Sequence, residues 1–265
     1  MSPHTPAHPD GDAPVLARAT GLELRHGDHL AVAASDLSLP AGGVVAVIGP
    51  NGSGKSTLLK ALAGVLAPSA GTVEVLGAPA RQSARRIAFV MQSVHAPDGT
   101  PLTVRDVVRM GRYATRGWFR PLGAQDRRRV QEAMDRMDIA DLAGRHLGEL
   151  SGGQRQRVYV AQGLAQDHDV LMLDEPLTGL DLVSAHRIDE LIHEEPARGV
   201  SVVFTTHDLD EAHAADHVVL MGGRVVASGT PARVLTRENL ERVYGIGSLH
   251  APRGAYWDEP HHHEA

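Results

Sequence analysis

The chain has 265 residues, which suffices for one large or two small domains with a buried core. Its formal net charge of −6 gives no basic footprint for nucleic acid, so no nucleic-acid partner is expected. It contains no cysteine, which excludes disulfides and thiolate metal sites, and no apolar run approaches the ~18 residues of a membrane span.

The two ends of the chain differ in composition from the rest. Residues 1–14 are rich in proline, histidine and aspartate, and they lack the charged start and apolar stretch of a signal peptide. We expect this segment to be a disordered N-terminal tail and residues 248–265 to be a His-rich C-terminal tail.

Three adjacent histidines in the C-terminal tail, with glutamates near them, carry the donor atoms of a Zn²⁺ or Ni²⁺ site. They are Glu259, His261, His262, His263 and Glu264. Short histidine tracts rarely hold a fixed geometry, so a disordered tail or the remnant of a tag explains the same residues. Both interpretations stay open.

A glycine-rich loop follows the first predicted strands. Residues 15–48 are expected to form short strands, and the last of these is the buried apolar run 44–48. The loop consists of Gly49, Pro50, Asn51, Gly52, Ser53, Gly54, Lys55, Ser56 and Thr57. It satisfies G-x-x-x-x-G-K-[ST] and leads into the predicted helix 58–63, which is the context this motif requires. A glycine turn with a chance lysine would not fill every fixed position.

Each part of this loop has a chemical task. The glycines let backbone N–H groups turn toward phosphate oxygens, and the helix N-terminus adds positive potential. Lys55 is expected to reach the β- and γ-phosphates of a nucleotide, and the Ser56 hydroxyl is expected to ligate Mg²⁺. The loop therefore predicts a nucleotide triphosphate site.

The middle of the chain changes from strands to helices. Residues 73–75 and 87–91 are predicted as further β segments, and residues 103–166 as mostly helical. A helix should begin near Thr103, after Pro101, and residues 125–137 should form an amphipathic helix with a solvated face. This pattern predicts an α/β core with a helical insertion.

A second anion site is predicted at the start of a later helix, over residues 155–165. The residues before it are Ser151, Gly152, Gly153 and Gln154. They offer a hydroxyl, free backbone N–H groups and a helix N-terminus. Taken alone, Ser151 would be interpreted as an ordinary helix N-cap.

Polar residues end two apolar strands further along. The strand 170–173 leads into Asp174 and Glu175, and the strand 202–206 leads into His207. Asp174 is suited to hold Mg²⁺, directly or through water, and Glu175 to orient or deprotonate a water aimed at the γ-phosphate. Sites in open α/β sheets form at such strand ends.

In this order the motifs resemble the ATP-binding cassette (ABC) family, over roughly residues 15 to 245. Residues 150–154 match the signature motif of that family without a substitution. The resemblance implies an ABC ATPase domain over residues 15–247 with a RecA-like α/β core. It further implies an antiparallel β subdomain and a helical subdomain, at about 95–166, that carries the signature.

The resemblance also implies roles for single residues. Gln92 matches the glutamine that senses Mg²⁺ and the lytic water, and His207 matches the switch histidine that contacts the γ-phosphate. Asp181, in the run 177–181, matches the loop that crosses the dimer interface. Alone, these residues could be a polar strand end, a helix cap and a helix N-cap, but the joint pattern favours the family roles.

The position that stacks on adenine departs from the family pattern, which usually has an aromatic residue near the first strand. Residues 24–27 contain no Phe, Tyr or Trp. His26 fits the slot best, because imidazole can stack on a base. A plain turn residue beside Gly27 is the alternative.

The family implies ATP and Mg²⁺ as cofactors and a head-to-tail homodimer, or a pair with a related cassette, that sandwiches ATP. Ser151 of one chain would then face the γ-phosphate held by Lys55 of the other. Closure and opening of this dimer would drive an integral membrane permease, with the chain at the cytoplasmic face of the cell membrane and an extracytoplasmic metal-binding protein acting indirectly.

An aromatic cluster suggests where the permease docks. Tyr113, Trp118 and Phe119 lie within seven residues of sequence, and they could equally form the core of the helical subdomain. The arginines expected at the rim of this patch are Arg109, Arg112, Arg116 and Arg120.

The amino-acid sequence around these residues resembles that of the ATPases of manganese, zinc or iron importers. The matching stretches are residues 103–108, 111–113 and 117–120. Uptake of a divalent metal ion, manganese or zinc first, is therefore the preferred function. Importers of ferric siderophores or cobalamin are the alternative, and a non-transport ABC ATPase is less favoured.

Overall fold

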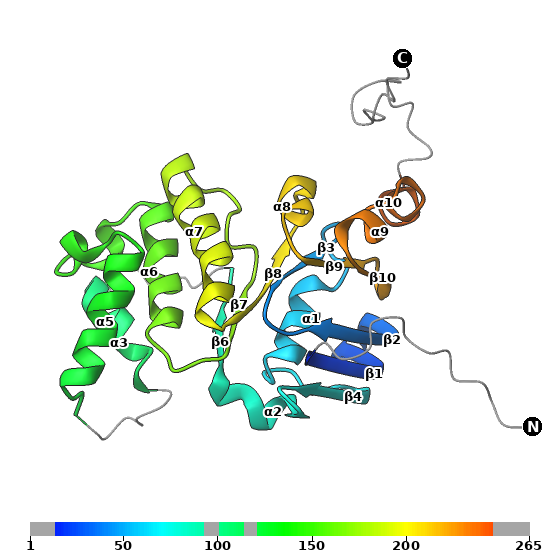
Figure 1. Cartoon of the computed structure of the whole chain (residues 1–265), viewed down its shortest axis with the longest axis horizontal. Helices are drawn as coiled ribbons and strands as arrows, with labels where there is room; N and C mark the ends of the chain where they lie inside the picture. The colour runs from blue at the N-terminus through cyan, green and yellow to red at the C-terminus, as the bar shows by residue number, and fades with distance from the viewer. Residues whose placement is uncertain (1–13, 93–100, 114–120, 246–265) are drawn as a thin grey trace, which may run out of the picture.

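Two β-sheets lie on either side of helix α1 (Lys55–Leu62) in the computed structural model, which describes residues 14–92, 101–113 and 121–245 (Figure 1). Leu58, Leu59 and Leu62 of α1 are fully buried between them. Helices cover the other face of the larger sheet and extend to one end of the molecule. The α/β class predicted from the sequence is confirmed.

The larger sheet has the strand order β10-β9-β3-β8-β7-β6 over the described residues. Its strands are β3 (Val44–Ile48), β6 (Ile87–Val90), β7 (Val170–Leu173), β8 (Ser201–Thr206), β9 (His217–Met221) and β10 (Val225–Gly229). All pairs are parallel except β9 with β10. Every residue of β3, β7 and β8 is buried, as expected of parallel strands covered on both faces.

The register of this sheet brings the predicted functional segments to one edge. Val90 pairs with Leu173, Leu173 pairs with Phe204, and Ile48 pairs with Thr206. Because these strands are parallel, their carboxyl ends lie together, and the segments that follow them begin at the same edge.

The smaller sheet is antiparallel, with the order β2-β1-β4-β5 among the described strands. Its strands are β1 (Val15–His26), β2 (His29–Pro40), β4 (Ala70–Val75) and β5 (Ala78–Pro79). β1 and β2 have 12 residues each, so the prediction of only short strands in this region was wrong. Gly21 has a φ of +56°, and register shifts accompany it, which interrupts the alternation of apolar residues along one continuous strand.

Three helices gather at one end of the molecule, away from the antiparallel sheet (Figure 1). They are α3 (Val104–Met110), α5 (Ala124–Arg136) and α6 (Gly152–Leu164). Thr103 caps α3 and forms a capping box with Asp106, which confirms the predicted helix start. The amphipathic helix predicted at residues 125–137 is α5, which buries Val130, Ala133 and Met134.

The remaining described elements complete the helical face and the sheet edges. They are α2 (Ala80–Ser83), α7 (Leu182–Glu194), α8 (Leu209–His213), α9 (Pro231–Val234), α10 (Arg237–Tyr244), and short 3-10 turns at Ala84–Arg86, Ala140–Leu142, Leu147–Glu149 and Glu195–Arg198. None of the helices within the described ranges has the length and apolar character needed to cross a bilayer.

Arg112 lies inside the helical region, so its prediction as part of an exposed rim was wrong. It is 3% exposed, and its guanidinium donates to Asp126, to Asp167 and to the Ala165 carbonyl at 2.7–3.0 Å. It thereby joins the ends of α3 and α6 to the start of α5. The predicted contact residues Arg116, Trp118, Phe119 and Arg120, and both predicted tails except Pro14, lie outside the described residues.

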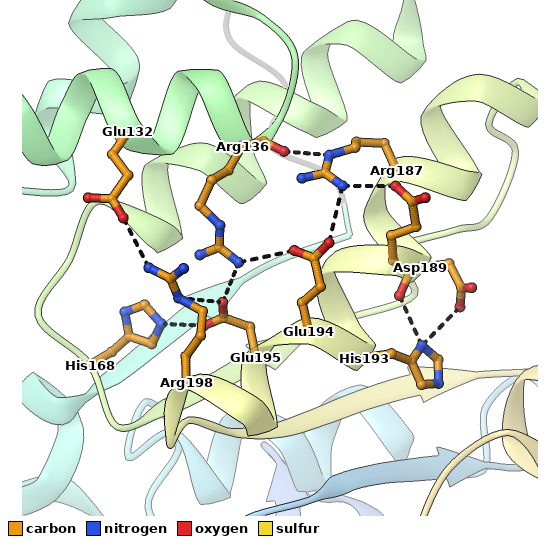
Figure 2. Close-up of polar contacts among 10 residues, drawn as sticks. Glu132, Arg136, His168, Arg187, Asp189, His193, Glu194, Glu195 and Arg198 are labelled. Atoms are coloured by element: carbon orange, nitrogen blue, oxygen red, sulfur yellow. Dashed lines mark hydrogen bonds and ion pairs between the residues drawn. The ribbon is translucent and has the colours of Figure 1, made fainter.

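A buried carboxylate ties the helical region to the core (Figure 2). Glu195, at the end of α7, is 2% exposed and accepts a hydrogen bond from Arg136 of α5 at 2.5 Å. His168 Nε2 lies 3.7 Å from its other oxygen. Burial would raise the pKa of Glu195, but the interactions with His168 and with the guanidinium of Arg136 outweigh it and lower the pKa. Glu195 thus carries a negative charge into the junction of the two regions.

Candidate functional site

The glycine loop has a backbone that other residues would not adopt or fit. Gly52 and Gly54 have φ values of +78° and +95°, in the left-handed region. A Cβ on Gly54 would lie 2.7 Å from the Ala31 carbonyl oxygen, and one on Gly49 would collide with the Met221 carbonyl. The loop runs from β3 into α1, as predicted, and leaves the N-terminus of α1 at its centre.

Lys55 is held across this loop by its own backbone. The side chain is 5% exposed, and Nζ donates to the carbonyl oxygens of Gly49 at 2.8 Å and Pro50 at 3.3 Å. Nζ also lies 3.7 Å from Glu175 Oε1. A fixed ammonium group beside a helix N-terminus is suited to bind phosphate.

Ser53 supplies an independent sign of a ligand. Its hydroxyl is buried and has no hydrogen-bond partner within the part of the chain that the structure describes. Buried polar groups are nearly always paired, and such an exception calls for a missing partner. Because Ser53 lies inside the loop, a phosphate oxygen is the partner that its position fits.

Hydroxyl and carboxylate oxygens meet at the end of β7. Ser56 Oγ donates to Asp174 Oδ1 at 2.8 Å, and Thr205 Oγ1 donates to the same oxygen at 2.7 Å. Asp174 is 5% exposed. Hard oxygen donors beside a phosphate site are the ligands that Mg²⁺ prefers, so Ser56 and Asp174 fit the predicted metal.

Glu175 is fixed in an unusual conformation. Its φ is +46°, which is rare for a residue with a Cβ. Its N–H donates to Thr205 Oγ1 at 2.8 Å, and its Oε2 accepts from Gln92 Nε2 at 2.5 Å. The structure therefore brings Gln92, Lys55 and Glu175 together, as their predicted roles require.

A pocket of about 740 Å³ opens over these groups. Its lining residues are His26, His29, Ala31, Asn51, Gly52, Ser53, Gly54, Lys55, Ser56, Thr57, Gln92, Glu175, Thr178 and His207. His26 Nε2 lies 3.2 Å from Thr57 Oγ1, at the side of the loop. The volume suits a nucleotide, and it includes the predicted base platform, phosphate loop and switch histidine.

The second predicted anion site lies elsewhere. Ser151 caps α6, and its Oγ accepts from Gln154 N at 3.2 Å. The residues of 151–154, all of them described, do not line the pocket, and neither does Asp181. The structure thus leaves Lys55 and Ser151 on separate sites of one chain.

Asp181 and the signature residues share one surface. Asp181 caps α7 and accepts from Ser184 N at 2.9 Å; this hydrogen bond from the Ser184 amide lowers the pKa of the Asp181 carboxyl. A Cβ on Gly153 would collide with the Asp181 carboxylate and the Ser184 hydroxyl. Glycine at position 153 therefore allows the starts of α6 and α7 to pack together.

Thr205 is a buried polar residue beside this site to which the sequence analysis assigned no role. It is 0% exposed and contacts both carboxylate residues. Two hydroxyl residues, Thr205 and Thr206, at the end of a buried strand were the available signal. Within the described residues no group of three His, Asp or Glu side chains is arranged to hold a metal ion, and the C-terminal histidines lie outside them.

Known proteins are similar to this chain in sequence and in fold. A family model described as ABC transporter matches residues 32–178. The chain is similar to the zinc transport system ATP-binding protein TroB of Treponema pallidum (strain Nichols), with 40% identity over 83% of this chain and 84% of TroB. It is also similar to the hemin import ATP-binding protein HmuV of Nocardia farcinica (strain IFM 10152), with 43% identity over 91% of this chain and 85% of HmuV.

A solved structure extends the likeness to three dimensions. It is described as an inward-facing conformation of a metal-chelate type ABC transporter. The TM-score is 0.77 at 30% identity, over 88% of this chain and 90% of the other.

Proposed function

Since this chain belongs to the ABC transporter family, we propose that it is the ATP-hydrolysing subunit of an importer for a divalent metal ion, manganese or zinc first. Its fold is that of an ATP-binding cassette, with a RecA-like core, an antiparallel β subdomain and a helical subdomain. The observation that carries the ATPase assignment is the convergence of Lys55, Ser56 and Glu175 on one pocket at the glycine loop, with Asp174 hydrogen-bonded to Ser56.

The chemistry is attack of water on the γ-phosphate of ATP, in line with the leaving group. Loop amides and Lys55 bind the phosphates, and Glu175 orients the water and takes its proton. His207 lies at the pocket wall, where it can contact the γ-phosphate. Bound Mg²⁺, held by Ser56 and Asp174, would neutralise charge on the phosphates.

A second copy of the cassette, or a related chain, completes the site in this proposal. Ser151 offers a hydroxyl and a helix N-terminus, yet it does not share the pocket of Lys55. Head-to-tail packing of two chains would bring Ser151 of one to the γ-phosphate held by the other. Asp181 lies beside Gly153 and would then face the same interface.

His26 is the proposed adenine platform. Replacing it with alanine should raise the Michaelis constant for ATP roughly fivefold or more, near the lower end of base-stacking energies, and leave turnover at saturation almost unchanged. Steady-state kinetics over a range of ATP concentrations measure both constants. His26→Tyr should lower the constant, and His29→Ala is the matched control from the same pocket. If only His29→Ala raises the constant, the base stacks on His29.

The transport assignment rests on the relatives and on the need for a partner. The described part of the chain has no membrane-crossing helix, so transport work would need a separate permease, with the chain docked on its cytoplasmic face. An extracytoplasmic metal-binding protein would deliver the ion. The zinc-transport relative TroB supports a metal ion as cargo.

Import of a metal chelate is the second candidate. HmuV is named for hemin import, and the solved structure is described as a metal-chelate type. This is the same class of cargo as the ferric siderophores and cobalamin that the sequence left as alternatives.

Reconstitution with the neighbouring permease and binding protein tests the two candidates. We expect binding protein loaded with Mn²⁺ or Zn²⁺ to stimulate ATP hydrolysis several-fold over the apo binding protein. The same vesicles made with the Glu175→Gln chain control for contaminating ATPases. Stimulation by hemin or a ferric siderophore, and not by the free ions, would assign the chain to chelate import.

A further inference from the structure

Thr205 occupies a place where packing alone would favour valine. It lies on β8 after Val202, Val203 and Phe204, and it is fully buried. Valine has nearly the same shape as threonine, and burying a hydroxyl costs free energy unless it is hydrogen-bonded. The hydroxyl at this position therefore needs an explanation beyond filling the space.

The Thr205 hydroxyl forms hydrogen bonds with Asp174 and Glu175, the two residues that follow β7. Its oxygen accepts from the Glu175 N–H at 2.8 Å, and its single proton goes to Asp174 Oδ1 at 2.7 Å. The pairing of β7 with β8 ends at Leu173 and Phe204, directly before these contacts. A side-chain hydroxyl thus replaces the next backbone pairing, at the point where the chain turns into the left-handed conformation of Glu175.

The two contacts have different consequences. Within the described residues, the side-chain hydrogen bonds of Asp174 come from Ser56 and Thr205, and both fall on Oδ1. These two bonds hold Oδ1 in place, and within the described residues no side chain donates a hydrogen bond to Oδ2. The bond to the Glu175 amide stabilises a backbone with positive φ, and that backbone sets the direction of the Glu175 side chain.

We propose that Thr205 is a positioning residue for ATP hydrolysis, whose hydroxyl orients Asp174 toward the metal ion and holds the Glu175 backbone in the conformation that aims its carboxylate at water. This inference rests on the proposed ATPase function. Thr205 does not line the pocket, and it would act through the two carboxylate residues that it contacts.

Thr205→Val removes the hydroxyl and keeps the shape. We expect turnover to fall ~10–100-fold, and the Mg²⁺ concentration that half-saturates ATP binding to rise by about tenfold, as for the loss of a hydrogen bond to a charged group. The Michaelis constant for ATP at saturating Mg²⁺ should change less than about twofold, because the phosphate loop is untouched. Thr205→Ser should restore turnover to within a few-fold of the native value.

A readout independent of activity follows from the amide contact. Hydrogen exchange at the Glu175 N–H should accelerate in Thr205→Val and stay slow in Thr205→Ser. The matched control is Ser201→Ala, at the other end of β8, whose buried hydroxyl accepts from Gly42 N at 2.9 Å and contacts neither carboxylate. It should leave turnover, the Mg²⁺ midpoint and exchange at Glu175 unchanged.

The outcomes separate this inference from the proposed function. If the native chain hydrolyses ATP and Glu175→Gln does so far more slowly, the chain is an ATPase. If Thr205→Val then keeps the native turnover and the native Mg²⁺ midpoint, the role proposed for Thr205 is wrong. If Thr205→Ser is as impaired as Thr205→Val, packing and not the hydroxyl matters, and the inference also fails. If the valine variant does not fold, Thr205→Ser and Thr205→Ala give the same comparison, because they differ only in the hydroxyl. A native chain without ATPase activity would overturn both proposals.

Discussion

Replacing Glu175 with glutamine should reduce ATP turnover by ~10²–10⁴-fold and leave ATP binding nearly intact. The amide keeps the size of the side chain, yet it cannot take a proton from water. Lys55 and the loop that binds phosphate are unchanged, and the Gln92 side chain can still pair with an amide oxygen. Phosphate release in steady state measures turnover, and a fluorescent ATP analogue measures binding.

The control for this variant is Glu241→Gln, which changes an exposed glutamate of α10 paired with Arg237. It should keep native turnover. Near-native turnover in Glu175→Gln would show that another group activates the water.

The Glu175→Gln variant should accumulate as a dimer when ATP is added, because it binds ATP and hydrolyses it very slowly. Its bound ATP would hold Lys55 of one chain against Ser151 of the other, which are separate in the single chain. Light scattering after size exclusion should show a doubled mass with ATP and a single mass without it. A mass that stays single across a wide range of protein concentrations would count against the sandwich.

Glu195→Ala should lower the free energy of unfolding by ~3–5 kcal/mol, the usual cost of removing one partner of a buried ion pair. The variant would leave Arg136 without its buried carboxylate, at the junction of α5 with the core (Figure 2). Each kcal/mol lowers the melting temperature by roughly 2–4 °C for a domain of this size. Thermal and denaturant unfolding measure both quantities.

A matched control comes from the same network. Glu132 pairs with Arg198 at 3.0 Å, but both side chains are more than half exposed, so Glu132→Ala should cost at most ~1 kcal/mol. Equal losses from the two variants would show that burial of Glu195 does not set its contribution.

The contribution of Glu195 should also depend on pH. Its pKa is lowered in the folded chain from the ordinary value of 4.5, because the interactions with His168 and Arg136 outweigh burial. A depressed carboxyl pKa gives stability that is present above the unfolded pKa and lost as pH falls through the folded pKa. The stability difference between native chain and Glu195→Ala should therefore be constant near neutrality and shrink once pH falls below about 4.5.

The residues of the phosphate loop and the strand ends could be predicted from sequence because their chemistry is local. A run such as 49–57 needs only its neighbouring strand and helix, and Asp174 and Glu175 follow one buried strand. The roles assigned to these residues remain predictions, but the structure places residues 51–57 and Glu175 at one pocket, with Asp174 hydrogen-bonded to Ser56.

The features that the sequence did not reveal depend on distant partners. Thr205 is 31 residues from Asp174 in sequence, and the two residues meet because β8 pairs with β7 in this register. Arg112 is buried because Asp126 and Asp167, 14 and 55 residues away, surround its guanidinium. Sequence alone does not show which of many arginines faces inward. Gly21 interrupts the alternation of apolar residues, so the sequence predicted short strands where β1 is one long strand.

Because Glu175 has a left-handed backbone, the residue that best stabilises the fold at this position differs from the residue that hydrolysis requires. A residue with a Cβ at a φ of +46° costs ~1–2 kcal/mol relative to the ordinary helical conformation, and glycine avoids most of that cost. Selection for a more stable fold would therefore favour glycine at this position, and selection for hydrolysis keeps glutamate. Directed evolution of this chain for heat resistance alone would tend to inactivate it here, so such a screen must retain ATP turnover as a second criterion.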